Sequence, residues 1–454
     1  MRILLADGDE EVNFFNNIHH IQIHRRIRAL RRFGEWCSEG QLRSSTLADV
    51  FLPLIGNYIG ATDTIDHHLV TEAIYATGSI AHSLTWGAYN NLIHQYLRLV
   101  KQKDASERVY VRTIVAILDK FHFNMDESVV AEGDGDGNAD TEETDGKKAQ
   151  EMTRISDSVH SRLLPALLNH LERRDENEDT TRIPIAVGIV NVAKHLPDPA
   201  RTTQVTRLLT ILSQAFRSRS QETRDLTRDT LCRIAVTLGP EFLPDIIREL
   251  RGALLRGPHL HVLAVVTHAL LVHLTSPENS VRFTNLDDCV EEIAYVSAEV
   301  IFGESGKDVR SEGFKTKLRE VRSSPSKGLD SFSILAKHIT SGKISALLHP
   351  VRAIMQETET LKILQLVDDV LKKIAGGINS NERISPSDLL SLCQTFVTQN
   401  AKFLQAVPAI KKKRSRKGED SAIVQLKRTS HVDSDHYANN SFRFVVPSPT
   451  WAAD

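Results

Sequence analysis

A short phrase that the chain repeats three times constrains its fold more than any other feature. Each copy has two large apolar residues, a proline, and further apolar residues two and six positions after the proline. The copies are Phe51-Leu52-Pro53 with Ile55 and Ile59, Leu163-Leu164-Pro165 with Leu167 and Leu171, and Phe242-Leu243-Pro244 with Ile246 and Leu250. Proline is tolerated in the first turn of a helix, whose N–H groups have no intrahelical partner. Each copy therefore predicts a helix that begins near its proline.

The spacing of the copies indicates a repeat. Successive prolines lie 112 and 79 residues apart. The second step corresponds to two periods of about 40 residues, the length of a HEAT or armadillo repeat, and the first step to about three such periods. Only 6% of the chain is aromatic, and leucine, isoleucine, valine and alanine supply most of its apolar residues. We therefore expect an all-α fold, an α-solenoid of HEAT/armadillo-like antiparallel helix pairs.

Changes in composition divide the predicted solenoid. Between Asp126 and Asp145 the chain has nine carboxylates and no basic residue, and a segment this acidic cannot form an apolar core. A second polar stretch follows Gly303 and contains Ser323-Ser324-Pro325-Ser326. The expected organisation is helical repeats at 1–125, 151–302 and 329–406, an acidic disordered insert at 126–150, a polar loop at 303–328, and a basic, mostly disordered tail at 407–454.

Helical periodicity also gives the individual elements. Within the repeats it predicts helices at about 46–59, 70–84, 87–102, 106–122, 153–173, 182–195, 201–217, 222–238, 241–255, 259–274, 286–301, 330–341, 344–356, 359–375 and 386–406. A first helix covers the arginine-rich stretch described below.

Composition excludes several classes of protein. The four cysteines, Cys37, Cys232, Cys289 and Cys393, are far apart and form no CxxC pair, which argues against a disulfide framework and a zinc site. No apolar run approaches the roughly 18 residues of a membrane span, and residues 1–9 lack the basic-then-apolar order of a secretory signal. We therefore expect a soluble, intracellular protein.

Two stretches resemble metal-binding motifs, but neither has all the residues that its motif requires. Asp134 to Asp145 resembles the start of an EF-hand loop, yet Ala139 stands where the sharp turn needs glycine and Asp145 where a bidentate glutamate is needed. The four histidines between 259 and 273 have no cysteine or carboxylate at ligand spacing. The chain also lacks a glycine-rich phosphate loop, a nucleophile elbow and an HExxH motif. We therefore predict no metal, no cofactor, no catalytic residue and no enzymatic activity.

The first of two basic clusters lies on a predicted helix with no acidic residue from Ile18 to Phe33. A solvated helix face usually mixes lysine with glutamate at i,i+4 spacing. Unpaired arginines instead attract phosphate or an acidic protein surface, because the planar guanidinium suits phosphate; a plain solvated face stays the alternative. The candidate RNA- or phosphate-binding residues are Arg25, Arg26, Arg28, Arg31 and Arg32. Three of them, Arg25, Arg28 and Arg32, are expected opposite an apolar face of Ile23, Ile27 and Leu30.

The second basic cluster lies in the predicted tail. Runs of this kind are typical of nuclear-localisation signals and equally of nucleic-acid-binding tails. The candidate residues for nuclear localisation or RNA binding are Lys411, Lys412, Lys413, Arg414, Arg416 and Lys417.

Short segments in a fixed order along the chain carry a resemblance to one protein family. They are Phe14 through Arg32, Leu84-Thr85-Trp86 with Tyr89, Thr227-Arg228-Asp229-Thr230-Leu231, Leu238-Gly239-Pro240, Arg248-Glu249-Leu250 with Leu254 and Arg256-Gly257, His261-Val262-Leu263, Ile301-Phe302-Gly303-Glu304, and Gly376-Gly377-Ile378-Asn379-Ser380-Asn381. Together they resemble the large HEAT-repeat family of the small-subunit processome, also called the down-regulated-in-metastasis family. The resemblance covers roughly residues 10–440.

The resemblance implies a non-catalytic scaffold in the nucleus and nucleolus. Such a scaffold assembles on pre-ribosomal RNA with a box C/D small nucleolar ribonucleoprotein and other processome proteins, and supports the early cleavages that release the small-subunit rRNA precursor. It implies neither a membrane nor a small-molecule substrate. Because family members are several times longer, it also implies that the chain is an internal portion of such a protein.

Other scaffolds share the predicted architecture and stay open as alternatives. A HEAT-repeat nuclear transport receptor should present a strongly acidic inner surface to basic cargo, whereas the clearest charge stripe here is arginine. Another protein-binding scaffold, of the phosphatase-regulatory type, should show more uniform repeats and no basic tail. Recovery of precursor rRNA and a small nucleolar RNA with the purified protein distinguishes the processome from both.

Overall fold

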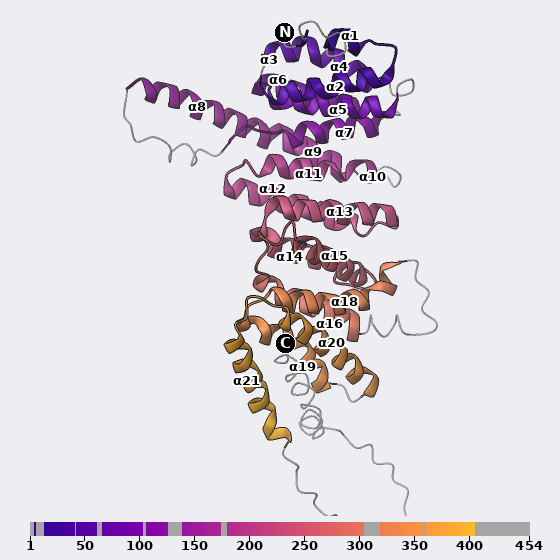
Figure 1. The fold of residues 1–454 in the computed structure, drawn as a ribbon, viewed down its shortest axis with the longest axis vertical. Helices are drawn as coiled ribbons and strands as arrows, with labels where there is room; N and C mark the ends of the chain where they lie inside the picture. Colours follow the sequence, from indigo (N-terminus) through magenta and orange to yellow (C-terminus); the bar gives the residue numbers. More distant parts are fainter. Residues whose placement is uncertain are drawn as a thin grey trace, which may run out of the picture. The chain divides into compact units, whose positions relative to one another are not determined.

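The computed structural model describes residues 4–5, 13–40, 42–60, 66–102, 106–125, 139–173, 179–303, 318–357 and 360–404, without the side chains of 139–148, 179 and 399–404. Within these ranges the regular elements are helices and none is a strand (Figure 1), which confirms the all-α prediction. The chain divides into two compact units, Met1–Leu238 (unit 1) and Gly239–Asp454 (unit 2). Gly239 has a φ of +95°, a conformation that favours glycine.

Unit 1 is built from stacked helix pairs. Its helices are α1 (Phe14–Ile18), α2 (Ile23–Ser38), α3 (Ser44–Thr46), α4 (Leu52–Gly60), α5 (His67–His82), α6 (Trp86–Lys101), α7 (Glu107–Asp119), α8 (Ala139–Ser158), α9 (Leu164–Glu172), α10 (Asp179–Arg182), α11 (Ile185–Ala193), α12 (Asp198–Ala215) and α13 (Gln221–Leu238), with π-helical turns η2 (Leu47–Phe51) and η4 (Val159–Leu163). The pairs are α1/α2, α4/α5, α6/α7, α9/α11 and α12/α13. The second helices form one continuous row, α2–α5–α7–α11–α13, as expected of a solenoid.

Unit 2 repeats this plan. Its helices are α14 (Leu243–Leu254), α15 (His259–Leu274), α16 (Val290–Phe302), α18 (Glu320–His338), α19 (Ile344–Glu357), α20 (Leu361–Asn379) and α21 (Pro386–Leu404), with 3₁₀ turns η5 (Pro240–Phe242), η6 (Asp287–Cys289) and η7 (Ser341–Lys343). Two rows run through it, α14–α16–α19 and α15–α18–α20. Helix α21 contacts the turn η7.

The apolar residues of the repeated phrase lie in the core. The buried ones are Phe51, Ile55, Ile59, Leu163, Leu164, Leu167, Leu171, Phe242, Leu243, Ile246 and Leu250. Leu52, which the pattern also placed inside, is only half-buried. No described helix is both long enough and apolar enough to cross a membrane.

Polar contacts between neighbouring pairs reveal the period of the repeat. Arg31 on α2 contacts Glu72 on α5, 41 positions later in the chain. Asp330 on α18 contacts Lys373 on α20, 43 positions later. Both separations match the period of about 40 residues that the spacing of the prolines predicts.

Contacts of the same kind span more residues where the loop between two repeats is long. His261 on α15 contacts Ser324 on α18 across 63 positions, and Asn191 on α11 donates to Asp119 on α7 across 72. The acidic segment lies between Asp119 and Asn191. The step from Pro53 on α4 to the proline of α9 therefore covers two repeats, by way of α6, and the expectation of about three periods was wrong.

Two of the three prolines lie inside a continuous helix. Pro53 and Pro165 each follow a π-helical turn of five residues, η2 or η4, that passes directly into α4 or α9. The helical path begins earlier, at Ser44 and within α8. A π-turn widens the helix and frees backbone groups next to the proline ring, which has no N–H to donate. Pro244 lies in the first turn of α14, next to the 3₁₀ turn η5, as expected.

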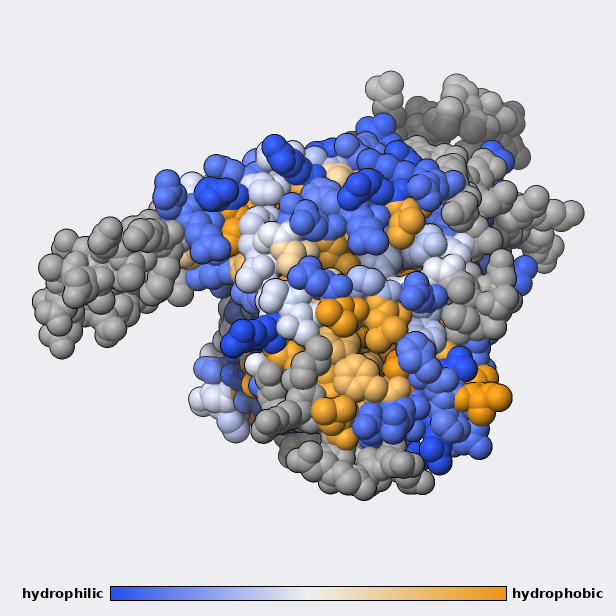
Figure 2. Space-filling view, turned by 90° about the horizontal axis from the view of Figure 1, so that it is seen from above, coloured by the Kyte–Doolittle hydropathy of each residue, from blue (hydrophilic) through white to orange (hydrophobic). Residues whose placement is uncertain are grey.

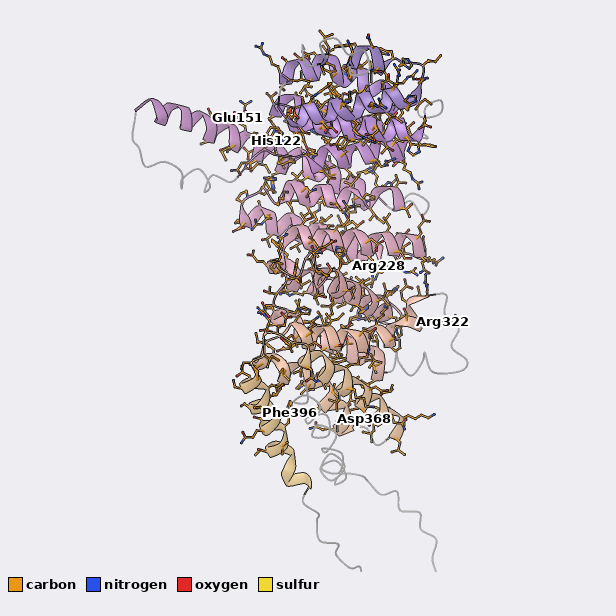
Figure 3. The ribbon with its side chains drawn as sticks, in the orientation of Figure 1. His122, Glu151, Arg228, Arg322, Asp368 and Phe396 are labelled. Atoms are coloured by element: carbon orange, nitrogen blue, oxygen red, sulfur yellow. The ribbon has the colours of Figure 1, made fainter. Side chains whose placement is uncertain are left out.

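The acidic segment is more helical than its composition indicated. Residues 139–150, expected to be disordered, form the start of α8, which projects from the stack of unit 1 (Figures 1 and 3); Glu151, labelled in Figure 3, lies on it. The later turns of α8 are anchored by Ile155, 5% exposed, and continue into η4. A helix anchored at one end extends at low cost per residue, and Ala149, Gln150 and Glu151 are good helix formers. Residues 126–138 lie outside the described residues.

The predicted polar loop is also shorter than expected. Helix α18 begins at Glu320 and contains Pro325, so 320–328 is helix, whereas 304–317 lie outside the described residues. Proline cannot donate to the carbonyl of Val321, but the Ser324 hydroxyl donates to that carbonyl at 3.3 Å. Val321 and Ser324 are also buried against the neighbouring helices. Packing therefore overrides a serine- and proline-rich composition.

The N-terminal end of unit 1 presents apolar surface. Figure 2 looks onto this end and shows hydrophobic residues gathered in the middle of the face, with hydrophilic residues around them. The first elements leave four large apolar side chains exposed, Phe15, Ile21, Ile23 and Val50.

Replacing Ile246 by Asp should destabilise unit 2 by about 3 kcal/mol or more, because Ile246 is 0% exposed and an unpaired charge would be buried there. The exposed Val281, 82% exposed, provides the matched control: Val281→Asp should stay within about 0.5 kcal/mol. Urea unfolding followed by circular dichroism measures both. Equal destabilisation by the two variants would contradict the assignment of Ile246 to the core.

Thiol reactivity should report the packing of the cysteines. Burial raises the pKa of the Cys37, Cys232 and Cys289 thiols to about 12, so they hold almost no reactive thiolate at pH 8. Cys393 is only half-buried and burial raises its pKa less. A native chain mixed with Ellman's reagent should show one fast thiol, which Cys393→Ser removes, and all four thiols should react in urea. A fast phase that survives in Cys393→Ser would show that a supposedly buried thiol is accessible.

Candidate nucleic-acid interface

Helix α2 carries the five arginines of the first basic cluster and packs on α1 and α5. Its buried residues are Ala29, Leu30, Phe33, Gly34 and Cys37. Ile23, expected on the apolar face, is 43% exposed, and Ile27 is half-buried. The buried face of α2 therefore begins later in the helix than the periodicity indicated, and the arginine-rich first turns lie toward solvent.

Arg26 has a local structural role. Its Nε donates a hydrogen bond to the carbonyl oxygen of His20 at 2.5 Å. It also lies near Tyr58, whose hydroxyl donates to the carbonyl oxygen of Ile18 at 2.7 Å. Burial raises the pKa of Tyr58, and the positive charge of Arg26 partly offsets that increase. Arg26 therefore ties the start of α2 to the preceding loop, which leaves it a weaker candidate for RNA.

Arg31 is held by an acidic residue from the next repeat. Its guanidinium lies 2.5 Å from a carboxylate oxygen of Glu72 on α5. The hydrogen bond and charge of Glu72 raise the pKa of Arg31 further. The absence of acidic residues near the arginines in the sequence had indicated that all five are unpaired. The contact with Glu72 shows that Arg31 is paired. Exposed ion pairs of this kind contribute little to stability.

Arg28 is the most available arginine of the helix. It is exposed and forms no hydrogen bond or ion pair with any described residue. Arg25 and Arg32 are half-buried, and one nitrogen of Arg32, Nη1, is buried with no hydrogen-bond partner in the described part of the chain. Spacings of three and four residues place these three on one side of α2. The stripe Arg25, Arg28 and Arg32 can therefore present positive charge to a phosphate backbone, with Arg28 the most exposed.

The other predicted sites have separate outcomes. The tail cluster, Lys411 to Lys417, and residues 134–138 of the EF-hand-like stretch lie outside the described residues, whereas residues 139–145 of that stretch are the first turns of α8. His261 is buried with its Nδ1 2.6 Å from the hydroxyl of Ser324. His268 is buried with its Nδ1 3.5 Å from the hydroxyl of Ser331. These histidines join neighbouring repeats, and no group of three potential metal ligands occurs among the described residues.

Comparison with known proteins adds an identification. Residues 172–397 match the model of a family described as the U3 small nucleolar RNA-associated protein 20 domain. The chain carries a domain of this family. The matched segment begins at the end of α9 and continues into α21, so it includes the last repeats of unit 1 and most of unit 2.

Two curated relatives extend the similarity over most of the chain. The U3 small nucleolar RNA-associated protein 20 of Schizosaccharomyces pombe is 32% identical over 419 residues, which cover 90% of this chain and 16% of that protein. The protein of the same name from Saccharomyces cerevisiae is 30% identical over 446 residues, which cover 97% of this chain and 17% of that protein. The chain thus spans about one-sixth of the length of the relatives that it matches.

Solved structures give only weak global matches. A structure of Kap95p bound to RanGDP is 14% identical and covers 87% of this chain and 48% of its own, with a TM-score of 0.32. The Kap95:Nup1 complex is 13% identical and covers 89% of this chain and 60% of its own, with a TM-score of 0.27. An engineered protein is 15% identical and covers 96% of this chain and 99% of its own, with a TM-score of 0.25.

Arg28→Ala should weaken binding of single-stranded RNA, while Arg31→Ala should have a smaller effect because Glu72 already holds that guanidinium. If Arg28 contacts one phosphate, its removal should lower the log–log dependence of affinity on salt by about 0.7. Fluorescence anisotropy with a labelled oligonucleotide across a salt series measures both variants. Equal effects, or no effect of Arg28→Ala, would identify the stripe as a solvated face.

Proposed function

We propose that this chain is a scaffold segment of the small-subunit processome, which supports pre-rRNA processing and assembly of the small ribosomal subunit. The observation that carries the proposal is the similarity at 32% and 30% identity, over 90% and 97% of the chain, to two proteins named for association with U3 small nucleolar RNA. The proposed partners are pre-rRNA, the box C/D small nucleolar ribonucleoprotein and other processome proteins. The proposed role is non-catalytic.

The fold supports a scaffolding role. Stacked helix pairs expose a long surface relative to their core, and such surfaces bind extended partners. The buried His261 and His268 contact serine hydroxyls of the neighbouring helix α18 and so join successive repeats. The exposed Arg28 and its neighbours on α2 supply charge that suits a phosphate backbone without selecting a base sequence.

Purification of the tagged full-length protein should recover U3 small nucleolar RNA and uncut pre-rRNA well above an unrelated small nuclear RNA. Depletion of the protein should lower the small ribosomal subunit and accumulate its uncut precursor RNA, with the large subunit mostly normal. Northern blots and sucrose gradients measure both results. Normal small-subunit levels after complete depletion would overturn the processome assignment, and a transport-receptor role would then be tested next.

We also propose that the protein acts in the nucleus and nucleolus. The basic run from Lys411 to Lys417 is suited to nuclear import and adds weak phosphate affinity. Changing Lys411, Lys412, Lys413 and Arg414 to Gln should move the fluorescently tagged chain toward the cytoplasm. The matched control changes four exposed cations of unit 2 instead, Arg256, Arg322, Lys337 and Lys372. Equal localisation of the two variants would show that the run is not the import signal of this segment.

A further inference from the structure

A positively charged cavity lies between two neighbouring repeats of unit 1. Its volume is about 320 Å³, and it opens where the end of α6 meets η4 and α9. The lining residues are Leu97, Lys101, Arg162, Pro165, Ala166, Asn169, His170 and Arg173. Three of them are cations, and none of the described lining residues is a carboxylate.

The three cations are not used by the fold. Lys101, Arg162 and Arg173 are exposed, and none of their side chains forms an ion pair or hydrogen bond with a described residue. Lys101 and Arg173 lie at the C-terminal ends of α6 and α9, where the helix dipole favours positive charge. The helix dipole therefore explains why Lys101 and Arg173 are cations. It does not account for the convergence of three unpaired cations on one cavity.

A buried histidine supports the same interpretation. His170 is 6% exposed, lines this cavity, and its Nε2 is buried with no hydrogen-bond partner in the described part of the chain. Buried polar atoms without a partner are uncommon and call for an explanation. Burial and the nearby Arg182, Arg173 and Lys101 lower the pKa of His170 to about 4. The imidazole is therefore neutral at pH 7 and able to donate one hydrogen bond.

The positive potential extends beyond the cavity wall. Burial lowers the pKa of His94 on α6, and so do the charges of Arg98, Arg162 and Lys101. Positive charge therefore lies near His94 as well as near His170. A dissolved anion would be attracted to this point over distances of about 10 Å at ordinary salt.

A second cavity shares the lining residue Arg173 with the first. It has a volume of about 690 Å³, and its lining includes Arg217, Arg219, Ser218 and Ser220. Glu172 also lines it, but its carboxylate lies 3.9 Å from Arg207, which partly neutralises its charge. The buried Arg182 donates to the carbonyl oxygen of Arg173 at 3.0 Å and so fixes the backbone of the residue that lines both cavities.

We propose that these two cavities form a binding site for the phosphate backbone of single-stranded RNA, with one phosphate held by Lys101, Arg162 and Arg173. The second cavity receives the next part of the strand, where Arg217, Arg219 and the serine hydroxyls offer further donors to phosphate. The concave shape fits a single strand, because the phosphates of a rigid duplex lie on a convex surface. This proposal rests on the proposed function for the source of the RNA.

The lining also predicts how the strand is recognised. No described residue of either cavity is a phenylalanine, tyrosine or tryptophan, and the ring of His170 is buried, so the stacking of bases on exposed aromatic rings, common in single-strand binders, is not offered there. Arginine and lysine contacts to phosphate fix position but carry no sequence information. Binding should therefore depend strongly on salt and only weakly on base sequence.

The test compares two variants that remove equal charge from the whole 454-residue chain. The first is Lys101→Ala, Arg162→Ala and Arg173→Ala. The control is Arg256→Ala, Arg322→Ala and Lys337→Ala, three exposed cations of unit 2. The basic run at 411–417 contributes the same background to both. Anisotropy of a labelled single-stranded RNA of about 12 nucleotides, a duplex of equal length and a phosphopeptide is measured across a salt series, with melting temperatures as the check on folding.

The cavity variant should bind the single strand about ten-fold or more weakly, and its salt slope should fall by about 0.7 for each phosphate that the cations no longer neutralise. The control variant should bind as the unchanged chain does, and both should melt at the same temperature. His170→Leu should also weaken RNA binding without lowering the melting temperature, which a purely structural histidine would not do.

Equal RNA affinity of the cavity and control variants would overturn the proposal. So would a preference of the cavity for the phosphopeptide over the single strand, because that would assign it to a modified protein. These measurements use purified components, so they can fail while U3 RNA still copurifies with the full-length protein, and they can succeed if it does not. The two proposals are therefore tested separately.

Discussion

Burial of apolar helix faces between successive repeats is the interaction on which each unit depends. A single helix pair cannot cover its own apolar face, so each pair is stable only when stacked. Leu30 on α2 and Ile114 on α7 are both 0% exposed within one continuous row of unit 1. The row keeps its spacing even where the connecting loops lengthen, as the 72-residue separation of Asp119 and Asn191 shows. Insertions therefore alter the loops and leave the stack intact.

The sequence predicted which segments form helices better than it predicted where each helix begins. Apolar spacing identified the helices because each buries one face, and it gave the period of about 40 residues. The prolines misled us, since Pro53 and Pro165 follow π-helical turns within longer helices. Composition misled us at 139–150 and 320–328, where propagation from a packed helix and the Ser324–Val321 contact outweigh polar character. Local propensity cannot report contacts made with the next repeat.

The sequence likewise predicted only part of the candidate interface. Periodicity correctly placed the five arginines on one helix, but it could not reveal that Glu72 holds Arg31. A signal for that pair was present, because one repeat period added to position 31 leads to position 72. The cavity beside α9 had no such signal. Lys101, Arg162 and Arg173 belong to different elements and meet only through the packing of α6 against the following repeat. Sequence alone therefore gave the fold and one charged surface, but not the concave one.

The central claim is that this stack of repeats contacts RNA through its folded surface. Ultraviolet cross-linking of the native particle, followed by mass spectrometry of the linked peptides, tests it most directly. The account predicts RNA-linked peptides from unit 1, at α2 or at the segments that contain Lys101, Arg162 and Arg173. Cross-links confined to residues 407–454, with none in the helical repeats of a particle that contains U3 RNA, would contradict it.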